Sequence, residues 1–206
     1  MAERSGLGIG GPGLHGPAGW DEVLRFWIEE VGPERWYRSD EALDREIRER
    51  FEPMWEMARH GKLDHWQAAP RKALALILLL DQFPRNMFRG TEKAFMTDAK
   101  ARKVAKMAID HDFDLHIPEP ERQFFYLPLM HSECLADQER CVRLFKTRMP
   151  RTGAANLPHA RAHREEIRRF GRFPERNAAL HRATRPAEQD YLEHGGYGGL
   201  LRAVSH

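Results

Sequence analysis

The sequence predicts an all-α protein, and three observations carry that prediction. Apolar residues recur every three or four positions along most of the chain, which is the period of an amphipathic helix. No segment alternates apolar and polar residues as a half-buried strand would. Short links containing Gly or Pro separate the helical segments, and such links favour antiparallel neighbours. We therefore expect about eight antiparallel-packed helices.

The expected helices follow one another from Val23 to Leu192. The second contains Pro53, which should kink or split it. The third is apolar on all sides from Ala73 to Leu80, so we place it at the centre of the fold. In chain order, the apolar stripes cover residues 23–31, 43–58, 71–82, 91–110, 121–129, 132–145, 158–170 and 184–192.

The two ends of the chain differ in composition from the rest. Residues 1–19 are rich in Gly and Pro and are predicted to form a flexible arm. They contain a Gly-x-Gly-x-x-Gly spacing from Gly8, but no strand precedes it and Pro12 lies within it. This spacing therefore does not indicate a dinucleotide site. We expect a single helical domain over 20–194 and a Gly-rich tail over 195–206.

Charge and cysteine content narrow the functional classes. The formal net charge of the 206 residues is +2, so overall charge favours no polyanionic partner. Bases strongly outnumber acids over residues 143–185, but no nucleic-acid-binding module is recognisable, and nucleic acid is not an expected partner. Cys134 and Cys141 are predicted to be reduced thiols of a cytoplasmic protein. The longest apolar run, 73–80, is too short to span a membrane.

A Phe-Pro turn with a following Arg and Asn occurs twice, over residues 81–91 and 171–184. In each copy Pro should end the preceding helix and hold Phe extended. The Asn tolerates a left-handed conformation, and Thr should cap the next helix. The turn does not require its arginines. They either bond the last carbonyls of the preceding helix or form a ligand site, and the sequence leaves both alternatives open.

Several polar residues occupy positions where an apolar one is expected. Asp81 ends the apolar third helix and faces its negative dipole end, so it needs a cationic partner, Arg85 or Arg172. Buried carboxylates must be paired, and helix ends meet in antiparallel hairpins. We therefore expect a polar site from the candidate residues Asp81, Arg85, Asn86, Asp98, His131, Glu133, His163, Arg172 and Arg176.

Two histidine patterns suggest other chemistry. His131, Ser132 and Glu133 offer a base, a hydroxyl and an acid in one turn, although the simpler role of Ser132 is to cap a helix. His159 and His163 have the spacing of helical metal ligands, but no third ligand is evident. We therefore predict no metal and no cofactor.

Three stretches resemble a bacterial family known only as a domain of unknown function, numbered 924. They are LLLDQFPRN with FRGT after it (78–91), FFYLPLMHSE (124–133) and the segment from His163 to Pro174. The resemblance covers roughly residues 20–194 and implies an all-helical fold similar to a right-handed tetratricopeptide-like array. It implies no activity. The chain departs from the family at Glu175, where His is usual, and at His181, where Gly is usual.

The surplus of Arg at the turns predicts binding of a small anionic molecule or an acidic peptide, with Arg as the bidentate group. One alternative is a hydrolase-like enzyme that uses His131 or His163 with a carboxylate, Glu133 or Asp98. Another is a scaffold that binds protein partners through a concave helical surface. The sequence does not indicate the oligomeric state.

Overall fold

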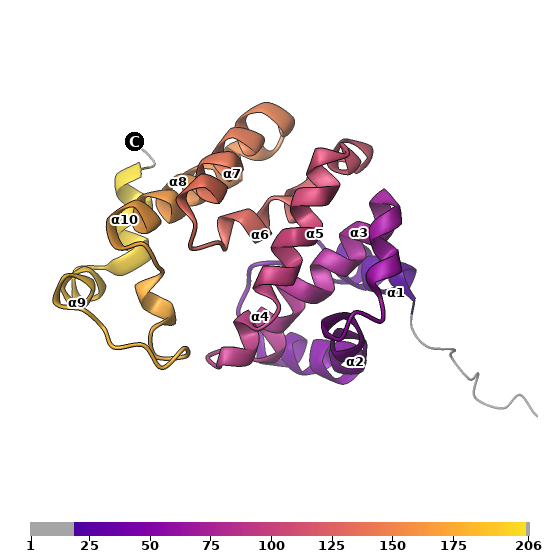
Figure 1. Ribbon diagram of the computed structural model, residues 1–206, viewed down its shortest axis with the longest axis horizontal. Helices are drawn as coiled ribbons and strands as arrows, with labels where there is room; N and C mark the ends of the chain where they lie inside the picture. Colours follow the sequence, from indigo (N-terminus) through magenta and orange to yellow (C-terminus); the bar gives the residue numbers. More distant parts are fainter. Residues whose placement is uncertain (1–18, 205–206) are drawn as a thin grey trace, which may run out of the picture.

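The computed structural model describes residues 19–204 of the chain. Every regular element in this range is helical and none is a strand, which confirms the predicted all-α class (Figure 1). No helix in the described range is long and apolar enough to cross a membrane. The predicted arm, apart from Gly19, lies outside the described residues.

The N-terminal half consists of helices packed around α3. Asp40 caps α2 by accepting hydrogen bonds from the amides of Ala42 and Leu43, and α2 continues unbroken past Pro53, which was expected to kink or split it. The elements are α1 (Trp20–Leu24), a π-helical segment (Arg25–Val31), α2 (Glu41–Arg59), a 3-10 turn (Asp64–Ala68), α3 (Pro70–Ile77), a second π-helical segment (Leu78–Gln82), α4 (Phe83–Met87), a 3-10 turn (Glu92–Phe95) and α5 (Asp98–Asp110).

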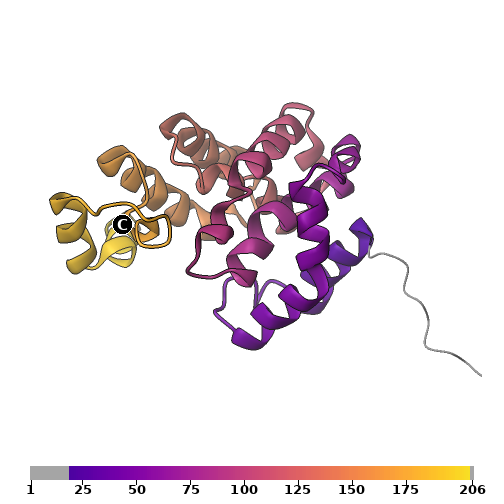
Figure 2. The same ribbon diagram turned by 60° about the horizontal axis from the view of Figure 1, so that its bottom comes forward.

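In the C-terminal half, α7 packs against α8, and α8 also packs against α10. The Gly-rich tail contains this last helix. The elements are two 3-10 turns (Phe113–His116 and Glu121–Phe125), α6 (Leu127–Met130), α7 (Leu135–Arg148), α8 (Gly153–Phe170), a 3-10 turn (Pro174–Arg176), α9 (Pro186–Glu193) and α10 (Gly196–Val204). Figures 1 and 2 show α9 and α10 at one end of the molecule and α1 and α2 toward the other.

The hydrophobic core surrounds α3 and the π-helical segment that follows it. All residues from Ala73 to Leu80 are buried, as the apolar run predicts. Aromatic rings cover this segment, with Phe83 packed against Phe51 and Trp27 at 4.9 and 5.4 Å between ring centroids. Each fully buried side chain of this size contributes roughly 1.5–3 kcal/mol, so the core holds the polar residues at its edge in place.

The first Phe-Pro turn does not end the helix, contrary to the prediction. Phe83 has helical torsions (φ −61°, ψ −40°) and begins α4, in whose first turn Pro84 is tolerated. The π-helical segment Leu78–Gln82 directly precedes α4. Because Pro84 has no N–H to offer to the preceding turn, the Leu80 carbonyl there accepts from the Thr97 hydroxyl at 2.6 Å.

The second turn has the predicted backbone only at Phe173, which is extended (φ −88°, ψ 107°) before the 3-10 turn Pro174–Arg176. Neither Asn is left-handed, since Asn86 lies within α4 and Asn177 is right-handed helical. The threonines do not cap helices either. Arg185, not Thr184, precedes α9, and Thr91 makes no side-chain cap bond. The two copies therefore share a sequence motif but differ in backbone conformation.

Candidate functional site

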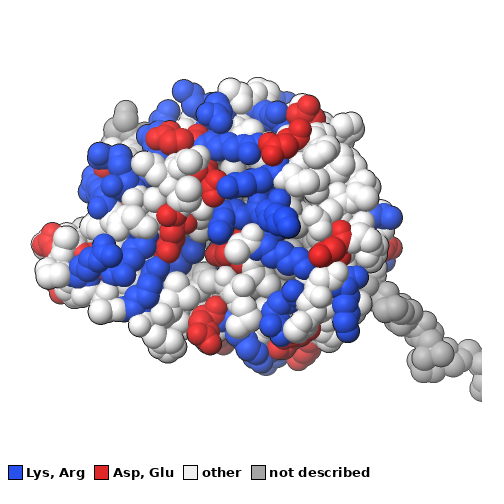
Figure 3. Space-filling model, viewed as in Figure 1, with Lys and Arg blue, Asp and Glu red and all other residues white. Residues whose placement is uncertain are grey.

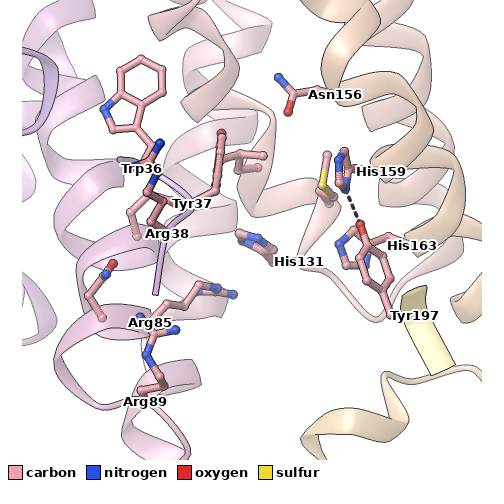
Figure 4. Close-up of a pocket in the computed structure, with 14 residues that line it drawn as sticks. Trp36, Tyr37, Arg38, Arg85, Arg89, His131, Asn156, His159, His163 and Tyr197 are labelled. Carbon is pink, nitrogen blue, oxygen red and sulfur yellow. Dashed lines mark hydrogen bonds between the residues drawn. The ribbon is translucent and has the colours of Figure 1, made fainter. Parts of the chain in front are cut away.

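A pocket with a volume of about 350 Å³ lies between the two halves of the chain. Figure 4 shows Arg85, Arg89 and the loop before α2 on one side, and His159, His163 and Tyr197 on the other, with His131 between them. Its wall consists of Trp36, Tyr37, Arg38, Gln82, Arg85, Asn86, Arg89, Leu127, Met130, His131, Asn156, His159, His163 and Tyr197.

Asp81 lies fully buried behind the pocket wall. Its carboxylate oxygens Oδ1 and Oδ2 lie 2.8 Å and 3.0 Å from Nδ1 of His131. The carboxylate also accepts a hydrogen bond from the side-chain amide of Gln82. Arg85 Nη1 lies 3.3 Å from Asp81 Oδ1. Burial by itself raises the pKa of Asp81, but the charge of Arg85 and the bonds from His131 and Gln82 outweigh it and hold this pKa at about 2. Asp81 is therefore ionised at neutral pH.

The arginines of the two turns meet at Asp98. Arg85 donates two bonds of 3.0 Å to the Asp98 carboxylate, and Arg176 Nη1 reaches the same carboxylate at 3.4 Å. Arg176 also donates to the His131 carbonyl at 3.0 Å. Burial and the nearby charge of Arg85 lower the pKa of Arg176 to about 10. The structure thus brings Asp81, Arg85, Asp98, His131 and Arg176 together.

His163 lies on the opposite wall, beneath Tyr197. The two rings are stacked, with 4.8 Å between centroids, and the Tyr197 hydroxyl is 2.5 Å from Nδ1 of His159. Nδ1 of His163 is buried and has no hydrogen-bond partner within residues 19–204, and Glu166 Oε2 lies 3.9 Å from it. Burial is the main cause that lowers the pKa of His163 well below its ordinary value, and the charge of Arg176 adds to it. His163 is therefore neutral at physiological pH.

Two of the expected site residues hold the second turn together instead. Glu133 accepts bonds from both Nη atoms of Arg182 and from the Phe173 amide. Arg172 bonds Glu188 at 2.6 and 2.7 Å and has no contact with Asp81. Neither Glu133 nor Arg172 lines the pocket.

Asn86 lines the pocket and donates to Asp44 at 2.7 Å. Arg89 is held by the same carboxylate, at 2.9 Å from Asp44 Oδ2. This pair ties α4 to the beginning of α2. Asn86 is thus oriented by a carboxylate 42 positions earlier in the chain, which helical periodicity does not predict.

Sequence reasoning missed several residues of the wall, above all Arg38 and Tyr197. Arg38 lies in a loop between helices, where no periodicity marks its direction. Tyr197 lies in the segment expected to be a Gly-rich tail, and it reaches the pocket because α10 packs on α8. The only available signal was the presence of large side chains within these two segments.

Many basic side chains outside the pocket are paired with acids. Arg168 and Arg169 bond Glu165, and Arg164 lies 3.3 Å from Glu139. Figure 3 shows Asp and Glu side chains interspersed among Lys and Arg on one face. Within residues 19–204, no group of three His, Cys, Asp or Glu side chains is arranged to hold a metal ion.

Comparison with known proteins agrees with this description. The family model "Bacterial protein of unknown function (DUF924)" matches residues 23–196. A solved structure of a protein of unknown function from Agrobacterium tumefaciens is similar, with a TM-score of 0.79 and 43% identity, over 85% of this chain and 97% of that one. No curated protein matches the chain. The chain therefore belongs to the DUF924 family of bacterial proteins of unknown function.

Proposed function

We propose that the pocket binds a small anionic molecule. The observation that carries this proposal is the charge of the wall, which includes Arg38, Arg85 and Arg89, while no Asp or Glu of the described residues lines it. A concave site surrounded by one sign of charge concentrates ligands of the opposite sign. Its volume of about 350 Å³ is in the range of small-molecule sites.

The three arginines differ in how they are held. Asp98 fixes Arg85 through two bonds, and Asp44 fixes Arg89. The side chain of Arg38 is exposed, and its guanidinium makes no hydrogen bond or ion pair with any residue in the described part of the chain. A free guanidinium at the mouth of a pocket is suited to bidentate capture of a carboxylate or phosphate. Arg38 is therefore the first contact that we assign to the ligand.

The apolar part of the wall supports a ligand that has an apolar group in addition to its negative charge. Leu127, Met130 and Trp36 line the pocket together with the stacked rings of His163 and Tyr197. Binding sites typically combine such an apolar lining with a few placed polar groups. A carboxylate or phosphate attached to a small apolar or aromatic body fits this lining, and so does the terminal residue of an acidic peptide.

The test is a screen of inorganic phosphate, citrate and aromatic carboxylates by thermal shift and calorimetry. Arg38→Gln should weaken binding roughly 10- to 100-fold, because a hydrogen bond to a charged group contributes about 1.5–3 kcal/mol. Arg143→Gln is the matched control, since Arg143 is exposed, its guanidinium has no partner in the described range, and it lies outside the pocket. The proposal fails if no anion stabilises the wild type more than Arg38→Gln.

A hydrolase-like activity is the second candidate, and one observation favours it. His131 faces the pocket and is bonded to Asp81, which is the arrangement of a base and its orienting carboxylate. The carboxylate is neither Glu133 nor Asp98, the two that the sequence suggested. No comparable observation within residues 19–204 favours a protein-binding scaffold.

A further inference from the structure

The bond between Asp81 and His131 decides which nitrogen of the imidazole carries the proton. An ionised carboxylate only accepts hydrogen bonds, so the nitrogen that contacts both of its oxygens, Nδ1, is the donor. Nε2 of His131 then carries the lone pair. No residue of the described chain bonds Nε2, and the side chain lines the pocket. The pocket therefore contains a base with a fixed orientation.

We propose that His131 is a catalytic base that activates water to hydrolyse an anionic ester bound in the pocket. The inference rests on the proposed function, because the arginines must first hold the anion beside His131. Arg38 is free to bind that anion, and Arg85 supplies a fixed positive charge next to the reacting atoms. Figure 4 shows His131 between these arginines and the opposite wall of α8 and α10.

The step balances without a further reagent. The water oxygen forms a bond to the acyl carbon or phosphorus while His131 Nε2 takes one of the water protons. The bond from that centre to the ester oxygen breaks, and its electron pair leaves with the alcohol oxygen. The protonated Nε2 then donates this proton to the leaving alcohol oxygen, which restores the neutral imidazole. Proton transfer by a positioned histidine accelerates such reactions about 10²- to 10⁴-fold.

The surroundings keep His131 in its basic form. Burial, followed by the charge of Arg85, lowers the pKa of its imidazole, and this outweighs the opposite effect of Asp81. Arg85 lies on the near wall and His163 on the far one, while Asp98, which bonds both Arg85 and Arg176, lies outside the pocket lining. The charge of Asp98, like that of Asp81, raises the pKa of His131. A neutral imidazole is the form that accepts a proton, so the base is available throughout the physiological pH range.

His163 provides an internal comparison. Among the described residues its Nδ1 has no hydrogen-bond partner, and Glu166 at 3.9 Å is beyond bonding distance. No hydrogen bond from the described part of the chain fixes the tautomer of His163, whereas two contacts fix that of His131. The geometry thus assigns the base to His131, and Asp81 acts through it as a positioning residue.

Hydrolysis tests the catalytic step directly. The probes are 4-nitrophenyl phosphate and the mono-4-nitrophenyl ester of glutaric acid, with 4-nitrophenyl acetate as the neutral probe. We expect turnover of one of the two anionic esters and a loss of about 100-fold or more in kcat for His131→Gln. His111→Gln is the matched control and should keep the wild-type kcat, because His111 is exposed and lies outside the pocket. Equal turnover by wild type and His131→Gln, or no turnover of either anionic ester, overturns the inference.

Nitrogen-15 NMR of the histidines tests the tautomer without any substrate. In the wild type, Nδ1 of His131 should be protonated and Nε2 should be unprotonated at pH 7. Asp81→Asn should lower kcat and change the pH profile of turnover, because the imidazole loses its ionised partner. Asp81→Glu keeps a carboxylate and should have a kcat and a pH profile closer to those of the wild type. An Nε2-protonated His131 in the wild type contradicts the inference even if Asp81→Asn fails to fold.

The two proposals can fail separately. If phosphate binds in an Arg38-dependent way but His131→Gln does not reduce turnover, the anion site stands and the catalytic role is wrong. If no anion binds and no anionic ester is hydrolysed, both are wrong.

Discussion

The Thr97 hydroxyl donates a hydrogen bond of 2.6 Å to the carbonyl of Leu80. Both residues are buried, and Nε1 of Trp55 donates to the same hydroxyl oxygen at 3.2 Å. This contact joins the start of α5 to the π-helical segment. It therefore sets the distance between the two acids of the site, Asp81 on that segment and Asp98 on α5.

Thr97→Val should destabilise the protein by about 1–3 kcal/mol, because it leaves a buried carbonyl without a donor. Thr97→Ser keeps the hydroxyl and should lose much less. The measurement is the free energy of unfolding in urea for the wild type and both variants. Equal stabilities of the Val and Ser variants would show that the bond contributes nothing.

Arg172→Leu should destabilise the fold and leave anion binding unchanged. Glu188 is buried and accepts bonds from Arg172, from the side chain of Asn177 and from the amide of Arg185. Removing Arg172 leaves an underpaired acceptor, at a cost of about 1–3 kcal/mol. Calorimetric titration with phosphate and urea unfolding separate the two effects.

The double variant Arg172→Leu with Glu188→Leu is the control for this prediction. Replacing both partners of a buried pair is often less costly than removing one of them. The double variant should therefore recover stability relative to Arg172→Leu. A drop in phosphate affinity for Arg172→Leu would instead place this arginine in the site.

Glu166→Gln should make the protein more stable at pH 8 than the wild type. Burial and the neighbouring Glu175 raise the pKa of Glu166 to about 9 in the folded state, from an ordinary value of 4.5. As the pH rises, the unfolded chain loses the Glu166 proton at a lower pH than the folded protein does. The contribution of Glu166 to the free energy of unfolding is therefore fully present below pH 4.5 and is lost as the pH rises toward 9. The free energy of unfolding should fall by at most about 1.4 kcal/mol per pH unit through this one group.

Thermal unfolding from pH 5 to pH 9 checks this sign. The Gln variant should show a flatter decline with pH than the wild type. Glu165→Gln is the matched control, because the bonds from Arg168 and Arg169 lower the pKa of Glu165 to about 2, and its contribution does not fall as the pH rises. A wild-type stability that increases from pH 5 to pH 9 and is unaffected by Glu166→Gln contradicts the prediction.

Tyr197→Ala should raise the pKa of His163. The Tyr197 ring stacks on the imidazole at 4.8 Å between centroids, and burial is the main cause of the lowered pKa. Removing the Tyr197 ring admits water to the His163 imidazole, and water favours the charged form of that imidazole. Titration of the histidine resonances measures the change, and Tyr197→Phe, which keeps the ring, should leave the pKa nearly unaltered.

Local rules predicted the helices well and the turns poorly. The period of the apolar residues predicted the buried third helix, since that signal is carried within a few residues of each position. The same rules predicted that Pro84 would end it. Pro84 instead enters the first turn of α4, because the π-helical segment and the Thr97 hydroxyl accommodate it. Neither of these is visible in the Phe-Pro motif itself.

The polar site shows the same division. The proximity of Arg85 to Asp81 follows from their spacing of four residues on one helix face. The pairing of His131 with Asp81 joins positions 50 residues apart, and no pattern in the sequence encodes it. Arg38 and Tyr197 enter the pocket through a loop and through the packing of α10 on α8, both of which depend on the assembled fold.

The sequence by itself determined that the chain is helical, that the segment from Ala73 to Leu80 is central, and that acids and arginines gather at the helix ends. Only the tertiary structure decided which of them meet. Arg172 and Arg176 lie in the same turn, yet the first bonds Glu188 and the second reaches Asp98. The reason is physical: helical periodicity arises from neighbours along the chain, whereas the partner of a long charged side chain is set by which surfaces the core brings together.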